Sequence, residues 1–345
     1  MQLNSLMALD VGGGTQDLLV WRADQAVENA VKMVLPAPTQ VAAARIRAAR
    51  ARGKAVHLHG FLMGGGAMHR AISEHIEHGL GVSATPEAAA SLADDLARVR
   101  AQGVAIAETA PAGAVMVFTT DLDLIALRQA CGLFEVALPE RLALAVCDHG
   151  FSPGFSNRKF RFRMWERFLA AGGFLADLIS DRPDPSLTRF SALKEQAPSA
   201  LCMDTAAAAA WGALQDPVVA GQAREGVCVV NLGNMHTVAF LVRAGLVLGI
   251  YEHHTGCLDA LTLSDHVRRF MRGNLGDDEV FASQGHGCAR RAEAPQGHDW
   301  PVALTGPRRA LAAGLGWRVA APHGDVMLSG CFGLVAAAQA WARGR

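Results

Sequence analysis

Asp10 is the first residue of the chain whose type and position point to chemistry. It follows an apolar run at residues 6–9 and precedes three glycines at 12–14. Glycine leaves backbone N–H groups open to a phosphate, and a carboxylate at the same turn is a ligand type that Mg²⁺ takes. A second apolar run at 18–21 follows at once, so the glycines are predicted to form a hairpin tip. The alternative is a glycine-rich hairpin that binds nothing.

A hairpin excludes the two commoner glycine-rich phosphate loops. A dinucleotide fingerprint leads into a helix, and a Walker loop requires Gly-Lys-Ser/Thr, whereas no lysine follows residues 12–14. Residues 227–242 repeat the opening pattern of strand, polar residue, glycine turn, threonine and strand. The polar residue is here Asn231, whose neutral amide binds Mg²⁺ less well than a carboxylate. We therefore expect a second phosphate hairpin that contributes less to the metal.

Several segments in this order resemble the actin-like ATPase superfamily of sugar kinases, actin and heat-shock chaperones. They are residues 8–17, 202–214, 227–242, 251–256, 302–307 and 324–334. The resemblance implies an α/β, two-lobed actin-like ATPase (ribonuclease H-like) fold with duplicated mixed sheets. It implies a first lobe at 1–215, a second lobe at 226–325 and a C-terminal helix at 326–345 that returns to the first lobe.

The same resemblance implies ATP and Mg²⁺ as cofactors, with Asp10 at the metal. The residues it assigns to the nucleotide are Asp10, Gly12, Gly13, Gly14, Thr15, Gln16, Asp204, Asn231, Gly233, Asn234, His236, Thr237, Thr305 and Gly306.

Four phrases, at residues 28–36, 148–158, 252–255 and 304–309, resemble a narrower prokaryotic family of unknown function. Its members carry the label of a pyruvate formate-lyase activating enzyme. A radical-type activase holds an iron–sulfur cluster on cysteines at C-x3-C-x2-C spacing. The seven cysteines here are nowhere that close, so the sequence excludes such a cluster.

Asp148 and His149 follow an apolar run at 142–147 and are candidate catalytic residues. A carboxylate at a strand end can accept a proton from an attacking hydroxyl, but Asp148 can equally cap the turn at 150–154. Asp121 is a second acidic candidate. His254 is the fourth candidate catalytic residue. Because His253 and His254 are neighbours in an extended segment, their side chains point to opposite faces and cannot easily bind one metal, and one of them is expected to face the nucleotide cleft.

Residues 157–165 alternate basic and apolar side chains, which predicts a strand. Lys159, Arg161 and Arg163 would share one face and bind an anionic substrate, or protect an edge strand by charge. Residues 86–102 are predicted to form one amphipathic helix. On another helix, at about 64–78, His69, His75 and His78 are expected to form a polar face rather than a zinc site.

Composition limits the remaining choices. Lys and Arg number 32 and Asp and Glu number 32, so net charge gives no reason to expect nucleic acid or an anionic membrane as a partner. No signal region or membrane span is recognised and the cysteines are scattered, so a cytoplasmic location is expected.

The sequence thus predicts phosphoryl transfer from Mg-ATP to a small substrate or to water. An ATP-switched activator or scaffold, and a nucleotide-binding module without turnover, are the alternatives. A homodimer or a protein partner is left open.

Overall fold

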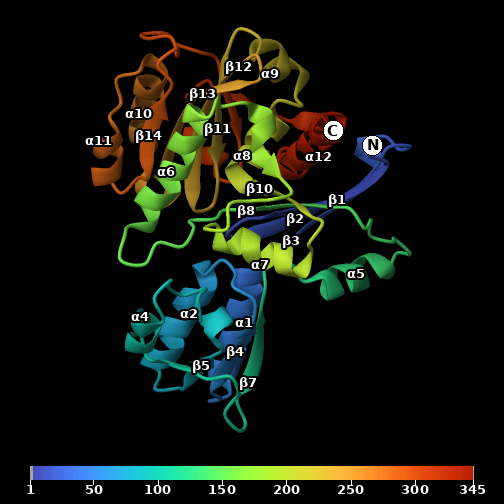
Figure 1. Cartoon of the computed structure of the whole chain (residues 1–345), viewed down its shortest axis with the longest axis vertical. Helices are drawn as coiled ribbons and strands as arrows, with labels where there is room; N and C mark the ends of the chain where they lie inside the picture. The colour runs from blue at the N-terminus through green and yellow to red at the C-terminus, as the bar shows by residue number, and fades with distance from the viewer. Residues whose placement is uncertain (1–2, 345) are drawn as a thin grey trace.

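The computed structural model describes residues 3–344, which contain three β-sheets (Figure 1). The first sheet has the strand order β3-β2-β1-β8-β10-β9. Strand β1 pairs antiparallel with β2 and parallel with β8, and their apolar residues are buried on both faces. The bounds are β1 (Ser5–Val11), β2 (Thr15–Arg22), β3 (Val31–Pro36), β8 (Leu142–Val146), β9 (Ile179–Ser180) and β10 (Leu201–Asp204).

The second sheet repeats this arrangement, in the order β14-β13-β12-β11-β15-β16. Strand β11 pairs antiparallel with β12 and parallel with β15, as β1 does with β2 and β8. The bounds are β11 (Val227–Leu232), β12 (His236–Arg243), β13 (Leu246–His254), β14 (Gly287–Arg290), β15 (Val302–Thr305) and β16 (Arg318–Val319). The duplicated mixed sheets confirm the predicted fold class.

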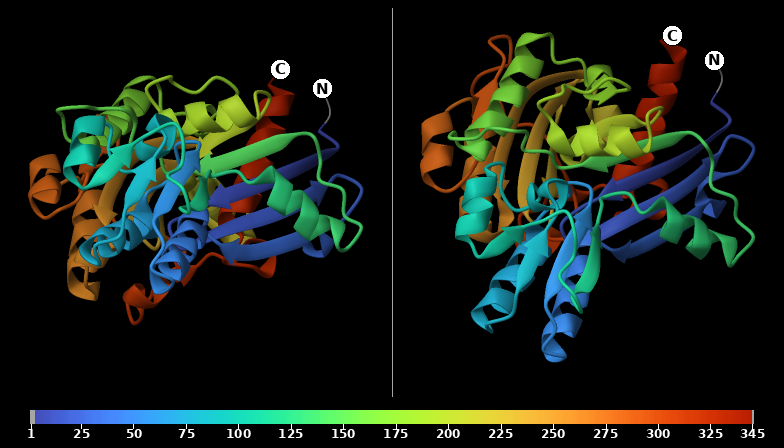
Figure 2. Two further views of the ribbon diagram at one scale, coloured as in Figure 1. Left: turned by 90° about the horizontal axis from the view of Figure 1, so that it is seen from below. Right: turned by 60° about the horizontal axis from the view of Figure 1, so that its bottom comes forward.

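A third, parallel sheet is inserted between β3 and β8 and projects from the rest of the molecule in Figures 1 and 2. Its order is β6-β5-β4-β7, with β4 (Val56–Gly60), β5 (Val82–Ala84), β6 (Val104–Ile106) and β7 (Val115–Thr119). Helices α1 (Pro38–Ala51), α2 (Gly66–Glu77), α3 (Pro86–Ala89) and α4 (Leu96–Ala101) belong to it. The single helix predicted at 86–102 is wrong, because α3 ends at Ala89 and a new N-cap, Asp95, starts α4.

Two helices lie against the duplicated sheets and form much of the main core. Helix α8 (Thr205–Ala213) contacts β1, β8 and β10 of the first sheet and β11 and β15 of the second, and α12 (Ser329–Arg343) packs on α8 and on β1 and β2. The helices approach closely because any Cβ at Gly212 or Gly333 would collide with backbone of the other helix. Figure 2 shows α12 beside the first sheet.

Residues 157–165 form part of a helix, so the predicted strand is wrong. Helix α6 (Asn157–Ala170) begins at the N-cap Ser156 and buries Phe162, Trp165 and Leu169. Their spacing of three and four residues is the helical period, which outweighed the alternation of basic residues. Arg161 therefore does not share a face with Lys159 and Arg163.

The other helices are α5 (Leu124–Gly132), α7 (Thr188–Gln196), α9 (Pro217–Gln222), α10 (Ala260–Arg272) and α11 (Asp277–Ala282). Among the described helices, none combines the length and apolarity needed to cross a bilayer. The predicted lobe boundaries stay a prediction, and residues 1–2 and 345 of those lobes lie outside the described residues.

Candidate functional site

The tips of the β1–β2 and β11–β12 hairpins border one cavity of about 340 Å³. The two tips have the same backbone design, because Gly12 N–H donates to Thr15 O and Gly233 N–H donates to His236 O, each at 2.9 Å. The cavity is therefore lined by two copies of the same turn, one from each duplicated sheet. Its volume is within the range of ligand pockets, roughly 300–1,000 Å³.

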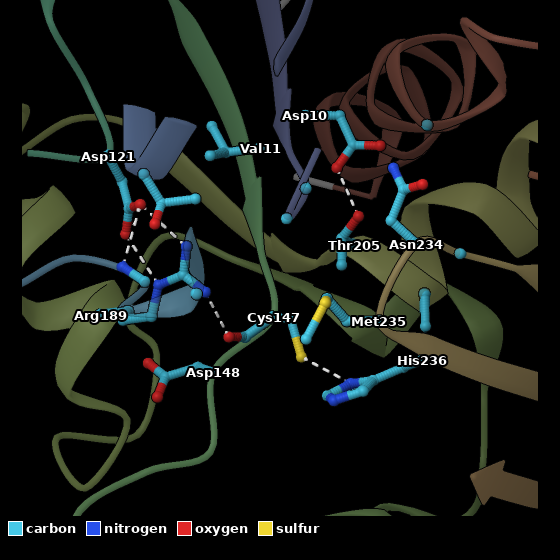
Figure 3. A pocket seen from close by; sticks show the side chains of 18 of the residues that line it. Asp10, Val11, Asp121, Cys147, Asp148, Arg189, Thr205, Asn234, Met235 and His236 are labelled. Atoms are coloured by element: carbon cyan, nitrogen blue, oxygen red, sulfur yellow. Dashed lines mark hydrogen bonds and ion pairs between the residues drawn. The ribbon is translucent and has the colours of Figure 1, made fainter. Parts of the chain in front are cut away.

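Glycines 13 and 14 are required by close packing and not by unusual dihedral angles. Neither has a positive φ. A Cβ at Gly13 would collide with Met235, and a Cβ at Gly14 would collide with the Asn234 amide. The glycines of the first tip thus let the side chains of Asn234 and Met235 in the second tip approach the backbone of the first. Figure 3 shows these two side chains at the cavity.

Asp10 ends β1 at the cavity wall and accepts a hydrogen bond of 2.5 Å from Thr205 Oγ1 (Figure 3). Helix α12 leaves room for the Asp10 side chain because residue 330 is a glycine. A Cβ at this position would overlap the Asp10 carboxylate. Burial and the nearby Asp17 raise the pKa of Asp10 to about 8. A carboxylate in such a place favours a neighbouring cation.

Asp17 supplies the second acidic group. It is the register partner of Asp10 across β1 and β2, lines the same cavity and is buried, with no hydrogen-bond partner for Oδ1 among the described residues. Burial, and secondarily Asp325, raise the pKa of Asp17 to about 7. Two neighbouring acids, of which Asp17 is buried with an oxygen left unpaired within residues 3–344, fit a Mg²⁺ ion.

Asn231 occupies the position in the second hairpin that Asp10 occupies in the first. It pairs in parallel register with Thr305 of β15, and its side chain lies against Gly306, where a Cβ would collide with the amide oxygen. Gly306 has φ +98°, a conformation that favours glycine. Asn231, Thr305 and Gly306, which the sequence assigned to the nucleotide, all line the cavity.

Asp121 lines the cavity but is bound to Arg189. The Arg189 guanidinium donates to both Asp121 oxygens, at 2.7 and 2.9 Å, and to Cys147 O at 2.6 Å (Figure 3). Both partners are largely buried. This ion pair ties the end of the inserted sheet to β8, so Asp121 has a structural partner in the place where a free base was predicted.

Asp148 has the hydrogen bonds of a turn cap. Its Oδ1 accepts from Gly150 N–H at 2.8 Å and its Oδ2 accepts from Phe190 N–H at 3.0 Å. Burial raises the pKa of Asp148, and those backbone donors oppose the rise. Of the two alternatives that the sequence left open, these contacts favour the cap.

Arg161 is buried in an ion-pair network that joins the two duplicated sheets. Its Nε donates to Glu252 Oε1 of β13 at 2.8 Å, and its Nη1 donates to Asp204 Oδ2 of β10 at 2.7 Å. Glu252 also accepts from Trp165 Nε1 at 2.9 Å. Burial by itself would raise the pKa of Glu252, but Arg161 and the nearby histidines hold it well below its usual range.

The predicted substrate-binding cations are thus engaged elsewhere. Lys159 Nζ pairs with Asp277 at 2.7 Å, and the Arg163 guanidinium lies 4.4 Å from the centre of the Phe155 ring. Arg161 lines the cavity with its charge already compensated. The expectation of an anionic substrate therefore loses its basis.

Four histidines gather beside the cavity, from three parts of the chain. His149 follows β8, His236 and His254 are register partners on β12 and β13, and His286 precedes β14. The predicted opposite facing of His253 and His254 holds, because His253 contacts Ser283 while the His254 ring makes tilted and edge contacts with the rings of His236 and His286. Burial lowers the pKa of His286 to about 3 and of His254 to about 4, so both are neutral.

His75 does not belong to the polar helix face that was predicted for α2. It is fully buried, and neither ring nitrogen has a hydrogen-bond partner among the described residues. His78, by contrast, is exposed at the end of the helix.

Some predicted nucleotide residues do not line the cavity. Gln16 Nε2 donates to Pro36 O, Asp204 caps α8 and pairs with Arg161, and Thr237 is buried against Thr255. Gly14 contacts the second tip, and His254 lies with the other histidines. The cavity residues that sequence reasoning missed include Asp17, Cys147, Arg189 and Thr205. Only Asp17 had a local signal, since its place in the strand after the first tip could have been paired with Asp10.

The duplicated mixed sheets and the two facing hairpins define the actin-like ATPase fold. Residues 63–311 match the family described as "Putative pyruvate format-lyase activating enzyme (DUF1786)", and the chain belongs to this family. A search of curated proteins finds no match.

Three solved structures are similar to the chain. Ethanolamine utilization protein EutJ from Carboxydothermus hydrogenoformans is 11% identical over 97% of this chain and 90% of that one, with a TM-score of 0.36. An exopolyphosphatase-like protein is 11% identical over 99% and 87%, with a TM-score of 0.30. A ROK family transcriptional regulator, a homolog of the E. coli MLC protein, is 7% identical over 71% and 38%, with a TM-score of 0.27. The fold assignment rests on the duplicated strand order rather than on these scores.

Proposed function

We propose that this protein binds Mg-ATP in the cavity and transfers the terminal phosphoryl group to a small substrate or to water. The observation that carries the proposal is the pair of equivalent hairpin tips around one cavity, with Asp10 and Asp17 at its wall. Backbone N–H groups at such tips suit phosphate oxygens, and two carboxylates suit the metal that accompanies them.

Several of the predicted residues that line the cavity have a role in the proposal. Gly12, Gly13 and Thr15 contact the phosphates from one side, and Gly233 and Asn234 contact them from the other. Asp10 holds Mg²⁺, directly or through water. Thr305 and Gly306, at the end of β15, adjoin the nucleoside. The phosphates of a nucleotide are negative and cannot neutralise Asp10 and Asp17, whereas a bound Mg²⁺ can. Nucleotide binding should therefore depend on Mg²⁺.

Phosphoryl transfer asks mainly for positioning and charge neutralisation. The proposal therefore assigns no general base, because Asp148 is hydrogen-bonded as a cap and Asp121 is paired with Arg189. His149 also lines the cavity, and burial and His236 hold its pKa well below the usual value.

The second candidate function is a nucleotide-dependent switch with little turnover, acting on a partner protein. It is favoured by Asn231, which brings no charge to the metal, and by the absence of a free carboxylate among the described cavity residues near the end of β8. A switch and a phosphotransferase share the nucleotide site and differ in turnover.

The decisive experiment measures the melting temperature with ATP, with and without Mg²⁺. Ligand binding to the folded state raises the free energy of unfolding, by about 2.7 kcal/mol at a ligand concentration of 100 times Kd, and the melting temperature rises with it. Asp10→Ala should remove the Mg²⁺-dependent part of the shift, and Asp24→Ala, at an exposed turn, should keep it. Folded protein that shows no shift with any purine nucleotide would refute the proposal. Steady-state ATP hydrolysis then separates the phosphotransferase from the switch.

A further inference from the structure

The histidines beside the cavity have the spacing of ligands around one metal ion. Their ring centroids are 5.2 Å apart for His236 and His254, 4.7 Å for His236 and His286, and 4.7 Å for His254 and His286. Three imidazoles on a tetrahedral ion, with metal–nitrogen bonds of about 2.1 Å, have ring centroids about 5 Å apart. A fourth imidazole, His149, has its Nε2 only 3.3 Å from Nε2 of His286.

The His286 ring has a nitrogen without a hydrogen-bond partner in the described part of the chain, which packing between histidines does not explain. His286 is fully buried, and its Nδ1 has no hydrogen-bond partner among the described residues. Its Nε2 faces the nitrogen of another imidazole rather than a carboxylate or a carbonyl group. A buried polar atom normally has a partner, so this arrangement calls for an absent group. A cation between His149 Nε2 and His286 Nε2 would satisfy these two nitrogens together.

The sheet builds the cluster without rearrangement. His236 and His254 are register partners on β12 and β13, and the backbone of His286 is held by its N–H bond of 2.9 Å to Glu252 O. The Glu252 side chain lies 3.2 Å from His236 Nδ1. A carboxylate on the second nitrogen of a ligand histidine is the usual outer partner in metal sites, because it fixes the ring orientation.

We propose that His236, His254 and His286 bind one first-row divalent cation of the zinc class, with His149 at the fourth position. Neutral imidazoles suit zinc and the other late divalent ions of that row, whereas Mg²⁺ prefers oxygen ligands. The site is distinct from the magnesium position at Asp10, which offers oxygens. It does not depend on the proposed nucleotide function.

Cys147 is a further potential ligand, because its Sγ lies 3.3 Å from His236 Nδ1. Since Nδ1 contacts both Cys147 and Glu252, the nitrogen of His236 that remains for the ion is Nε2. Cys147 then contacts a ligand without binding the ion. The proposal therefore expects Cys147→Ser to keep the metal.

The test uses the full chain, stripped with a chelator and titrated with Zn²⁺ while binding is measured by calorimetry. The wild type and Cys147→Ser should bind one equivalent. His286→Gln and His254→Gln should each weaken binding more than the 10–100-fold that outer-shell changes cost. His78→Ala, an exposed histidine of α2, is the matched control and should bind as the wild type does. An excess of Mg²⁺ should not compete.

His254 is only partly buried, so His254→Gln is the variant to use if His286→Gln fails to fold. Circular dichroism without metal checks the fold of each. The proposal is overturned if the wild type takes up no stoichiometric Zn²⁺, if folded His254→Gln binds like the wild type, or if Cys147→Ser abolishes binding while the histidine variants retain it. Co²⁺ spectra give a second readout: bands without a thiolate charge-transfer transition support the site, and such a transition contradicts it.

Discussion

Arg161 Nε lies 2.8 Å from Glu252 Oε1, and both side chains are buried where α6 meets β13. The same guanidinium reaches Asp204 at the end of β10. One cation thus connects a helix and both duplicated sheets. Removing one partner of a buried pair leaves an uncompensated charge, whereas replacing the pair by apolar groups can be neutral.

We therefore expect Arg161→Met to lower the free energy of unfolding by about 3–5 kcal/mol. Lys159→Met is the matched control on the same helix, because its pair with Asp277 is partly solvated and should contribute less than about 1 kcal/mol. Urea unfolding measures both. Adding Glu252→Gln to Arg161→Met should recover part of the loss, and equal small losses for the two single variants would contradict the network.

The stability should depend on pH through Asp17. Its pKa is about 7 in the folded protein against a usual value of 3.8, so the folded state binds the proton more tightly than the unfolded chain. The resulting stabilisation is fully present below pH 4 and is lost as the pH rises from about 4 to 7, at up to about 1.4 kcal/mol per pH unit.

Asp17→Asn should accordingly raise the melting temperature more at pH 7.5 than at pH 4.5, in buffer free of divalent ions. Asp24→Asn, at an exposed turn, is the control and should change neither value. Equal shifts at both pH values would mean that Asp17 does not titrate in this window.

Asp148→Asn tests whether the residue is a cap. An amide can accept one of the two backbone hydrogen bonds that the carboxylate accepts, from Gly150 and Phe190, and its NH₂ group would face the other donor. We expect a loss of about 1–3 kcal/mol in unfolding free energy with unchanged nucleotide affinity. A variant as stable as the wild type, but with any phosphoryl-transfer rate lowered, would restore the catalytic role.

Asn231→Asp tests the neutral position of the second hairpin. A carboxylate there would add charge on the far side of the cavity from Asp10, so the Mg²⁺ concentration at half-maximal nucleotide binding should fall, on the order of tenfold. Asn274→Asp, an exposed residue after α10, provides the control. An unchanged Mg²⁺ titration would mean that residue 231 does not face the ion.

Much of the fold could be predicted because its signals are local. The apolar runs on either side of residues 12–14 and 232–235 predict two hairpins. The repetition of this pattern along the chain predicts the duplication of the sheets. Asp10 and Asn231 could be placed at the cavity for the same reason, since each precedes a hairpin tip by a fixed number of residues.

The error in α6 has an equally local cause. Basic residues at every second position resemble a strand, yet the apolar positions 162, 165 and 169 have helical spacing. Burial of those apolar side chains favours the helix, and this decided the element. Reading the apolar residues alone would have given the helix.

The sequence by itself determined the two hairpins, their glycine tips and the acidic residue beside the first tip, because these depend on neighbours within about ten residues. Only the tertiary structure decided that Arg161 pairs with Glu252 and that His286 meets His236, across 91 and 50 positions of the chain. Such contacts follow from how strands and helices pack in space, and no local pattern encodes the partner of a buried charge. For that reason the sequence located the cavity between the hairpin tips but not the histidine cluster beside it.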